Sequence, residues 1–195
     1  MKKALSIIFL LIYISTSLSI GIAFAQKDNS GIYRNGDDFA KGKLSLAINC
    51  KTEKHNIKLN DFFSLPYIIV KHNDSSYKLY KKDIFGYKMC DGSVYRFDNK
   101  KELLLLNPTE QILIYKHIIA KPPTGLNNVT NYYFSLGSNS PVKLLTKSNL
   151  KAVFPGYNKF YESLNTEFKY NTQLAKYDDN HKIFRLNWLY QNNNN

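Results

Sequence analysis

The chain has 195 residues, and its 27 basic residues against 15 acidic ones give a formal net charge of +12. A charge of this size is typical of proteins that bind polyanions. However, 24 of the basic residues are Lys and only three are Arg, the residue that binds phosphate and base edges in bidentate geometry. The sequence therefore argues against nucleic acid as a partner, and its length predicts one domain that folds without a cofactor.

Residues 1–25 have the three parts of a secretory signal peptide: a basic start, an apolar middle and the small-residue exit Ala23-Phe24-Ala25. We expect export to the periplasm, the outer surface or the medium, with no transmembrane segment left after cleavage. An uncleaved membrane anchor is the alternative, and it places the rest of the chain on the same side. The remainder is predicted to be a single globular domain over 26–191 and a disordered Asn tail at 192–195.

The first elements after the leader are short. Residues 37–42 predict a single helical turn closed by Gly42, and residues 43–51 alternate apolar and polar side chains as a half-buried strand does. Short strands are expected at 57–59 and 67–71, the second followed by a polar turn.

The dipeptide Asp91-Gly92 between two strand-like runs predicts a hairpin with a two-residue type I′ turn. That turn would pair Cys90 with Ser93 and Tyr87 with Arg96.

A second hairpin is predicted from residues 102–107 and 111–119, which flank the turn Pro108-Thr109-Glu110. Both runs are apolar on both faces, which is typical of strands that are covered on two sides. The C-terminal third is expected to supply one cover.

Two last strands are expected at 132–136 and 142–145, before the helices begin. Thr146 has the position of a helix N-cap, and Leu145 and Leu150 have the spacing of a hydrophobic staple.

The repeat Phe160, Leu164, Phe168 predicts a second helix, and residues 178–180 are expected to cap a third over 181–191. The last segment also alternates as a strand does, and this alternative stays open. The predicted fold is α+β, an antiparallel β meander with two or three short C-terminal helices packed on one face. An all-β sandwich or barrel is the alternative.

Cys50 and Cys90 form a possible disulfide, because an even cysteine count in an exported chain permits one. Two buried free thiols are the alternative.

Motifs for catalysis are absent from the sequence, which has no nucleophile elbow, no phosphate-binding loop and no paired metal-ligand His. We therefore expect no catalytic residue, no metal site and no cofactor, and favour a binding role over catalysis. The candidate binding residues are Tyr87, Tyr95 and Arg96, which would offer aromatic faces and a guanidinium to a sugar or an anionic group. The competing interpretation places the tyrosines in the core and pairs Arg96 with an acid.

Three stretches carry a family resemblance: Gly31-Ile32-Tyr33 with Asp38-Phe39-x-x-Gly42-Lys43, Ile84-Phe85-Gly86-Tyr87 with Asp91-Gly92 and Tyr95-Arg96, and Leu145-Thr146-x-x-Asn149-Leu150-Lys151. In these stretches the chain resembles uncharacterised exported proteins of Bacteroidota. The resemblance implies an exported single-domain protein and transfers no catalytic residue.

The sequence thus leads to three hypotheses. The first is an exported non-enzymatic protein that binds an envelope protein, a glycan or another envelope component. The second is an exported hydrolase with a carboxylate pair, which a cleft holding two acids with opposite pKa shifts would favour. The third is Lys-mediated binding to an anionic surface, which a face of Lys residues alone would favour.

Overall fold

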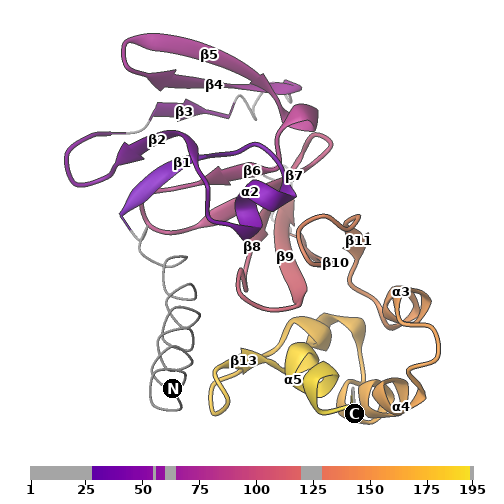
Figure 1. Ribbon diagram of the computed structural model, residues 1–195. Helices are drawn as coiled ribbons and strands as arrows, with labels where there is room; N and C mark the ends of the chain where they lie inside the picture. Colours follow the sequence, from indigo (N-terminus) through magenta and orange to yellow (C-terminus); the bar gives the residue numbers. More distant parts are fainter. Residues whose placement is uncertain (1–27, 55, 60–64, 120–128, 194–195) are drawn as a thin grey trace, which may run out of the picture.

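The computed structural model describes residues 28–54, 56–59, 65–119 and 129–193 (Figure 1). The predicted signal peptide lies outside the described residues. The fold is α+β with antiparallel sheets, so the predicted class is confirmed.

An eight-stranded antiparallel sheet is the frame of the molecule, with the order β11-β10-β9-β8-β7-β6-β1-β2. Its strands are β1 (Asn29–Tyr33), β2 (Ser45–Asn49), β6 (Gly86–Lys88), β7 (Val94–Asp98), β8 (Lys101–Leu105), β9 (Ile112–Ile119), β10 (Val129–Leu136) and β11 (Lys143–Leu144). From β6 to β11 each strand pairs with the next one in the chain, as in a meander, and β1 and β2 extend the sheet beyond β6. The main sheet is therefore larger than predicted, and it stays open because β2 and β11 do not pair with each other.

A second sheet of three strands packs on one face of the main sheet. It consists of β3 (Asn56–Lys58), β4 (Tyr67–His72) and β5 (Ser75–Tyr80). Its buried side chains Ile68 and Val70 share a hydrophobic cluster with Ile32, Tyr87 and Phe97 of β1, β6 and β7. The sequence did not predict this second layer as a separate sheet.

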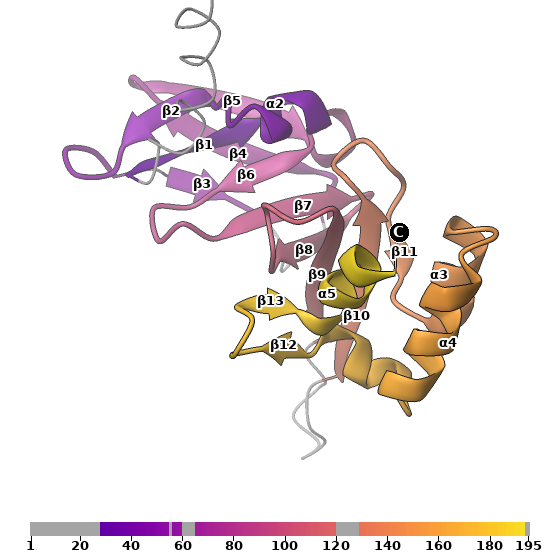
Figure 2. The same ribbon diagram turned by 60° about the horizontal axis from the view of Figure 1, so that its bottom comes forward.

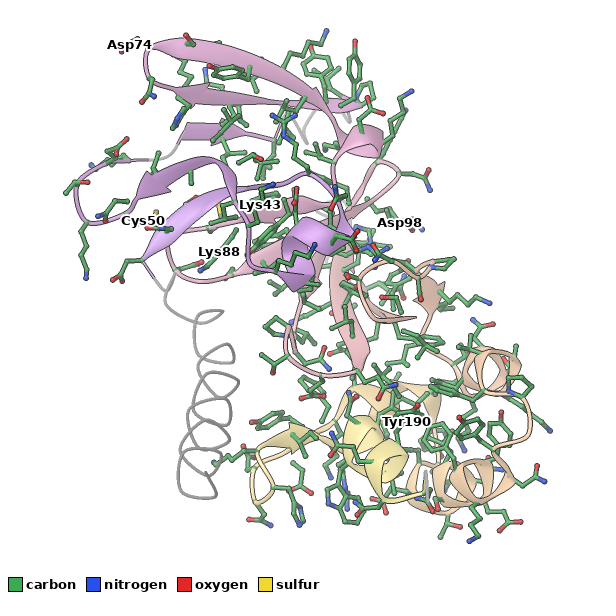
Figure 3. All side chains as sticks on the ribbon, viewed as in Figure 1. Lys43, Cys50, Asp74, Lys88, Asp98 and Tyr190 are labelled. Carbon is green, nitrogen blue, oxygen red and sulfur yellow. A yellow bond between two sulfur atoms is a disulfide. The ribbon has the colours of Figure 1, made fainter. Side chains whose placement is uncertain are left out.

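The same face of the main sheet is covered at its other end by α3 (Lys147–Val153), α4 (Asn158–Glu167) and α5 (Arg185–Asn192) (Figures 1 and 2). Ile112, Ile114 and Phe134 of β9 and β10 pack there against Leu150 and Leu164 of the helices. Tyr190 lies within this helical region, with its ring centroid 4.8 Å from that of Phe154 (Figure 3).

The opposite face is covered by α2 (Gly36–Ala40), the helical turn predicted at 37–42. Phe39 of α2 stacks on Phe85, with ring centroids 4.8 Å apart. The three described C-terminal helices share one face, as predicted, and α2, whose face the sequence did not predict, lies on the other.

The hairpin at Asp91-Gly92 has a different register from the predicted one. Tyr87 pairs with Tyr95, and Gly86 with Arg96. Gly92 has a positive φ of 88°, and Asp91 does not join it in that region; the Asp91 carboxylate instead accepts a hydrogen bond from the Ser93 amide. The loop thus has three residues, a type I turn followed by a left-handed Gly, and the predicted Cys90–Ser93 pair is wrong.

The two-residue turn with positive φ at both positions lies between β4 and β5. Asn73 and Asp74 have φ values of 46° and 56° there.

The C-terminal helix is confirmed, but its start was predicted wrongly. Asp178 lies in a small hairpin formed by β12 (Tyr177–Asp178) and β13 (Ile183–Phe184), where its carboxylate accepts hydrogen bonds from the amides of Asn180 and His181. These side chains therefore cap a turn, and α5 begins only at Arg185. Short 3₁₀ turns occur at Lys81–Asp83 (η2) and Asn171–Ala175 (η3).

The structure describes the first two residues of the predicted tail. Asn192 is the last residue of α5, and the Asn193 side chain donates a hydrogen bond to the Leu189 carbonyl. Amide side chains that return to the last turn of a helix extend its ordered part.

Two local predictions are confirmed in detail. Thr146 is the N-cap of α3, with Oγ1 accepting from the Asn149 amide at 3.1 Å. Cys50 and Cys90 form a disulfide with a Cα–Cα distance of 5.6 Å. Cys50 directly follows β2 (Figure 3), and Cys90 lies in the loop between β6 and β7. Since β1 lies between β2 and β6 in the sheet, the bond links the two neighbours of β1.

Candidate anion-binding site

The three predicted binding residues do not form one site. Tyr87 and Tyr95 pair across β6 and β7 on the same face, with ring centroids 5.0 Å apart and planes inclined by 13°. Arg96 follows Tyr95 on β7 and therefore points to the opposite face. The structure brings the two tyrosines together and separates them from the guanidinium.

Arg96 makes contacts inside the protein. Its Nη1 donates to the hydroxyls of Tyr115 at 2.8 Å and Ser135 at 3.0 Å, and Nη2 donates to the Ser140 carbonyl at 2.9 Å. The guanidinium also lies 4.9 Å from the ring centroid of Phe85. Arg96 thus joins β7 to β9, β10 and the loop after β10. Its partners are two hydroxyls, a backbone carbonyl and an aromatic ring, whereas the competing sequence interpretation expected an acid.

A pocket lies on the face that carries the two tyrosines. Register partners cross four neighbouring strands there: Tyr87 pairs with Tyr95, Tyr95 with Leu104, and Leu104 with Lys116. Tyr87 is covered by the small sheet, and Ile114, two residues before Lys116, is covered by the helices. The middle strands β7, β8 and the end of β9 lie between the two covers.

The pocket between the covers is strongly basic. It has a volume of about 510 Å³ and is lined by Lys81, Tyr95, Lys100, Lys101, Glu102, Leu104, Lys116, His117 and Ile118. Four lysines and one glutamate give its lining a net charge of +3 when the His is neutral. A concave site of one sign concentrates its electric field and attracts ligands of the opposite sign.

The lysines come from three separate elements. Lys81 belongs to η2 and is only 2% exposed, with Nζ 5.5 Å from the ring centroid of Phe97. Lys100 and Lys101 come from the turn into β8, and Lys116 from β9. Lys101 lies at the margin of the pocket: its Nζ is 3.9 Å from Asp98 and 5.1 Å from the ring centroid of Tyr133, whose ring belongs to the opposite face of the sheet.

Two other groups of the pocket lining have shifted pKa values. Burial raises the pKa of the Tyr95 hydroxyl, and the charges of Glu102 and Asp91 raise it further. Burial lowers the pKa of His117, and the charge of Lys101 lowers it further. Both shifts keep these side chains neutral at neutral pH, so the lysines provide the positive charge of the site.

A larger groove of about 720 Å³ lies on the opposite face and includes Tyr33, Lys88 and Glu110 in its lining. Burial raises the pKa of Glu110, and its carboxylate accepts a hydrogen bond from Asn107 Nδ2 at 2.8 Å and one from the Phe184 backbone. These bonds tie the β8–β9 turn to the start of α5. The groove therefore offers a ligand less charge than the basic pocket does.

Among the described residues, the two acids with opposite pKa shifts are Glu110 and Asp178. Burial raises the pKa of Glu110, and hydrogen bonds from His181 lower the pKa of Asp178. These two acids line different depressions, however. In the described part of the chain, no group of His, Cys, Asp and Glu is arranged to hold a metal ion.

The sequence pointed to Tyr95 but missed the lysines around it. They are far apart in the chain, and only the strand register brings them together. The usable signal was the turn at 108–110: once the β8–β9 hairpin is known, the period of two along a strand places Leu104 and Lys116 on the face of Tyr95.

Comparisons with protein-family models, curated proteins and solved structures find no match to this chain. Among the described residues no helix has the length and apolar character needed to span a membrane.

Proposed function

We propose that this is an exported, non-enzymatic protein that binds an anionic glycan of the cell envelope through an acidic sugar held in the basic pocket. The observation that carries the proposal is that Lys81, Lys100 and Lys116 line one pocket beside Tyr95, with Lys101 at its margin. A pocket of about 510 Å³ has the size of a site for a small ligand.

Two features support an exported protein. Residues 1–25 have the pattern of a signal peptide. The Cys50–Cys90 disulfide is of a kind that persists in oxidising compartments and is rare in the cytosol. The resemblance to exported proteins of Bacteroidota remains a prediction that agrees with both.

The residue types favour a sugar acid over nucleic acid. The pocket contains Lys and no Arg, and a Lys ammonium is a point charge without the bidentate geometry that suits phosphate diesters and bases. Tyr95 and Leu104 add an apolar floor for the carbon face of a ring. We place the acidic group near Lys100 and Lys116 and the ring against Tyr95.

Calorimetric titration of the purified protein tests this proposal with matched sugars. Methyl mannuronoside and methyl mannoside differ only in a carboxylate against a hydroxymethyl group, and mannose 6-phosphate tests the other acidic group. We expect binding of one or both acidic sugars and none of the neutral one. The stronger acidic sugar identifies whether carboxylate or phosphate is preferred.

A variant pair connects the binding to the pocket. Lys116→Gln should weaken binding of the acidic sugar by about tenfold or more, because a hydrogen bond to a charged group is lost. Lys159→Gln on α4 changes the net charge equally at an exposed position outside the pocket and should leave the affinity unchanged. Equal affinities of the two variants would refute the proposed site.

A further inference from the structure

The three-stranded sheet has an outer face that points away from the main sheet. Successive side chains of a strand alternate between the two faces, and Ile68 and Val70 of β4 are fully buried against the main sheet. The register pairs Tyr67 with Tyr80, Ile69 with Lys78, Lys71 with Ser76, and Lys58 with Ile69. These seven residues therefore share the outer face, here called the outer platform.

The outer platform is basic. Lys58, Lys71 and Lys78 lie on it and are exposed, and the three described strands contain no Asp or Glu. Acids flank these strands: Asp74 lies at the tip of the β4–β5 hairpin (Figure 3), and Asp83 lies in η2, three residues after Tyr80. The described strands of the platform themselves carry charge of one sign, from their lysines.

Two tyrosines accompany this charge. The ring centroids of Tyr67 and Tyr80 are 6.2 Å apart and their planes are inclined by 75°. Lys78 Nζ lies 4.1 Å from the Tyr67 centroid and 5.5 Å from that of Tyr80. The rings hold the ammonium in place, and Tyr80 remains 43% exposed. A large aromatic side chain and a positioned cation are therefore presented together on the surface.

We propose that the outer platform binds a chain of acidic sugars, an acidic polysaccharide whose carboxylates lie between the lysines. The charge complementarity comes chiefly from the exposed Lys71 and Lys78, on neighbouring strands that contain no Asp or Glu. The exposed ring of Tyr80 packs against the apolar face of one sugar. The platform shares no residue with the basic pocket, so this inference does not depend on the proposed function of that pocket.

The geometry favours an acidic polysaccharide over single-stranded nucleic acid. Nucleic-acid platforms stack successive bases on aromatic side chains. Here the ring planes are far from parallel, and Lys78 lies over the ring of Tyr67. Such a pair does not offer two aligned ring faces to neighbouring bases. Point charges spaced along a sheet suit a chain with one carboxylate per sugar.

Titration of the purified protein with oligomannuronate at physiological ionic strength tests the inference. The neutral control is an oligomannose of the same length, and single-stranded DNA is the competing polyanion. We expect binding of oligomannuronate, none of oligomannose, and weaker binding of DNA. DNA that binds as tightly as oligomannuronate would overturn the assignment.

Charge reversal locates the site. Lys71→Glu combined with Lys78→Glu should weaken oligomannuronate binding by more than about tenfold, because like charges then face each other. Lys143→Glu combined with Lys147→Glu, on β11 and α3, changes the net charge equally away from the platform and should have little effect. An unchanged affinity of the Lys71/Lys78 variant would overturn the inference.

A second measurement needs no variant. Amide chemical shifts of the wild-type protein titrated with oligomannuronate should change on β4 and β5. Changes confined to other strands would overturn the inference. The Lys71/Lys78 variant should still bind methyl mannuronoside as the wild type does, and Lys116→Gln should still bind oligomannuronate at the platform. These two variants distinguish a loss of binding at the outer platform from a loss of binding in the basic pocket.

Discussion

The side chain of Asn187 in α5 makes two hydrogen bonds to the backbone of Ile112 in β9, as the backbone of a neighbouring strand would. Its Oδ1 accepts from the Ile112 amide at 2.9 Å, and its Nδ2 donates to the Ile112 carbonyl at 2.9 Å. Asn107 supports the same segment, donating to the Ile112 carbonyl at 2.8 Å and accepting from the Ile114 amide. The two side chains satisfy buried backbone groups where β9 begins and attach the helical region to the sheet.

Replacing Asn187 should destabilise the folded protein. Asn187→Ala leaves the buried Ile112 amide without its acceptor and creates a small cavity, so we expect a loss of about 3 kcal/mol in the free energy of unfolding. Asn165→Ala, at an exposed position on α4, is the control and should have little effect. Urea denaturation of both variants measures the difference, and similar midpoints would show that the Asn187 bonds contribute little.

The disulfide should stabilise the fold substantially. Its cysteines are 40 residues apart in the chain, and the chain-entropy model assigns about 4 kcal/mol to a loop of that length. Combining Cys50→Ser with Cys90→Ser should lower the free energy of unfolding by about this amount. Wild-type protein kept in reductant should lose as much as the double variant. A reduced wild type as stable as the oxidised form would contradict the prediction.

The N-cap of α3 provides a smaller, local test. Thr146→Ala removes the acceptor of the Asn149 amide and should cost about 1 kcal/mol. Thr146→Ser keeps the oxygen and should retain most of the stability. Thermal unfolding of the two variants compares them directly; equal melting temperatures would mean that the cap contributes nothing.

His117 should make stability depend on pH. Burial and then the Lys101 charge lower its pKa below the usual 6.5. The unfolded chain therefore binds more protons than the folded one between the two pKa values, so stability falls as the pH drops from 6.5 toward the folded pKa. Urea midpoints at about pH 7.5 and about pH 5.5 should differ less in His117→Gln than in the wild type.

An NMR titration of the His117 ring checks the cause of this shift. Its pKa should lie below 6.5 in the wild type. It should rise toward that value in Lys101→Gln, because one of the two causes is removed. A His117 pKa at or above 6.5 in the wild type would contradict the assignment.

Features set by neighbouring residues were predictable from the sequence. Thr146 with its staple and the β8–β9 hairpin each depend on a few adjacent side chains. The hairpin at Asp91-Gly92 was predicted one residue out of register, because an Asp side chain that bonds its own backbone competes with the left-handed conformation that a type I′ turn requires. One residue of slip exchanges the faces of a strand, so the predicted site around Tyr95 could not be correct in detail.

Local sequence patterns could not predict the basic pocket or the second sheet. Lys81 and Lys116 are 35 positions apart and line the same pocket only because β6, β7, β8 and β9 pair in that order. Asn187 lies 75 positions from Ile112, and an asparagine within a helix carries no local signal of a partner on a strand. Long-range pairing of this kind is decided by the packing of the whole domain.

The edges of the main sheet also bear on how the protein behaves in concentrated solution. At one edge β2 is interrupted by a bulge, where Leu46 has a φ of 48°; at the other edge β11 has two residues. A bulge or a very short strand does not present the regular row of backbone hydrogen-bonding groups with which the edge strand of a second chain could pair. The main sheet can thus expose both ends without nucleating fibres.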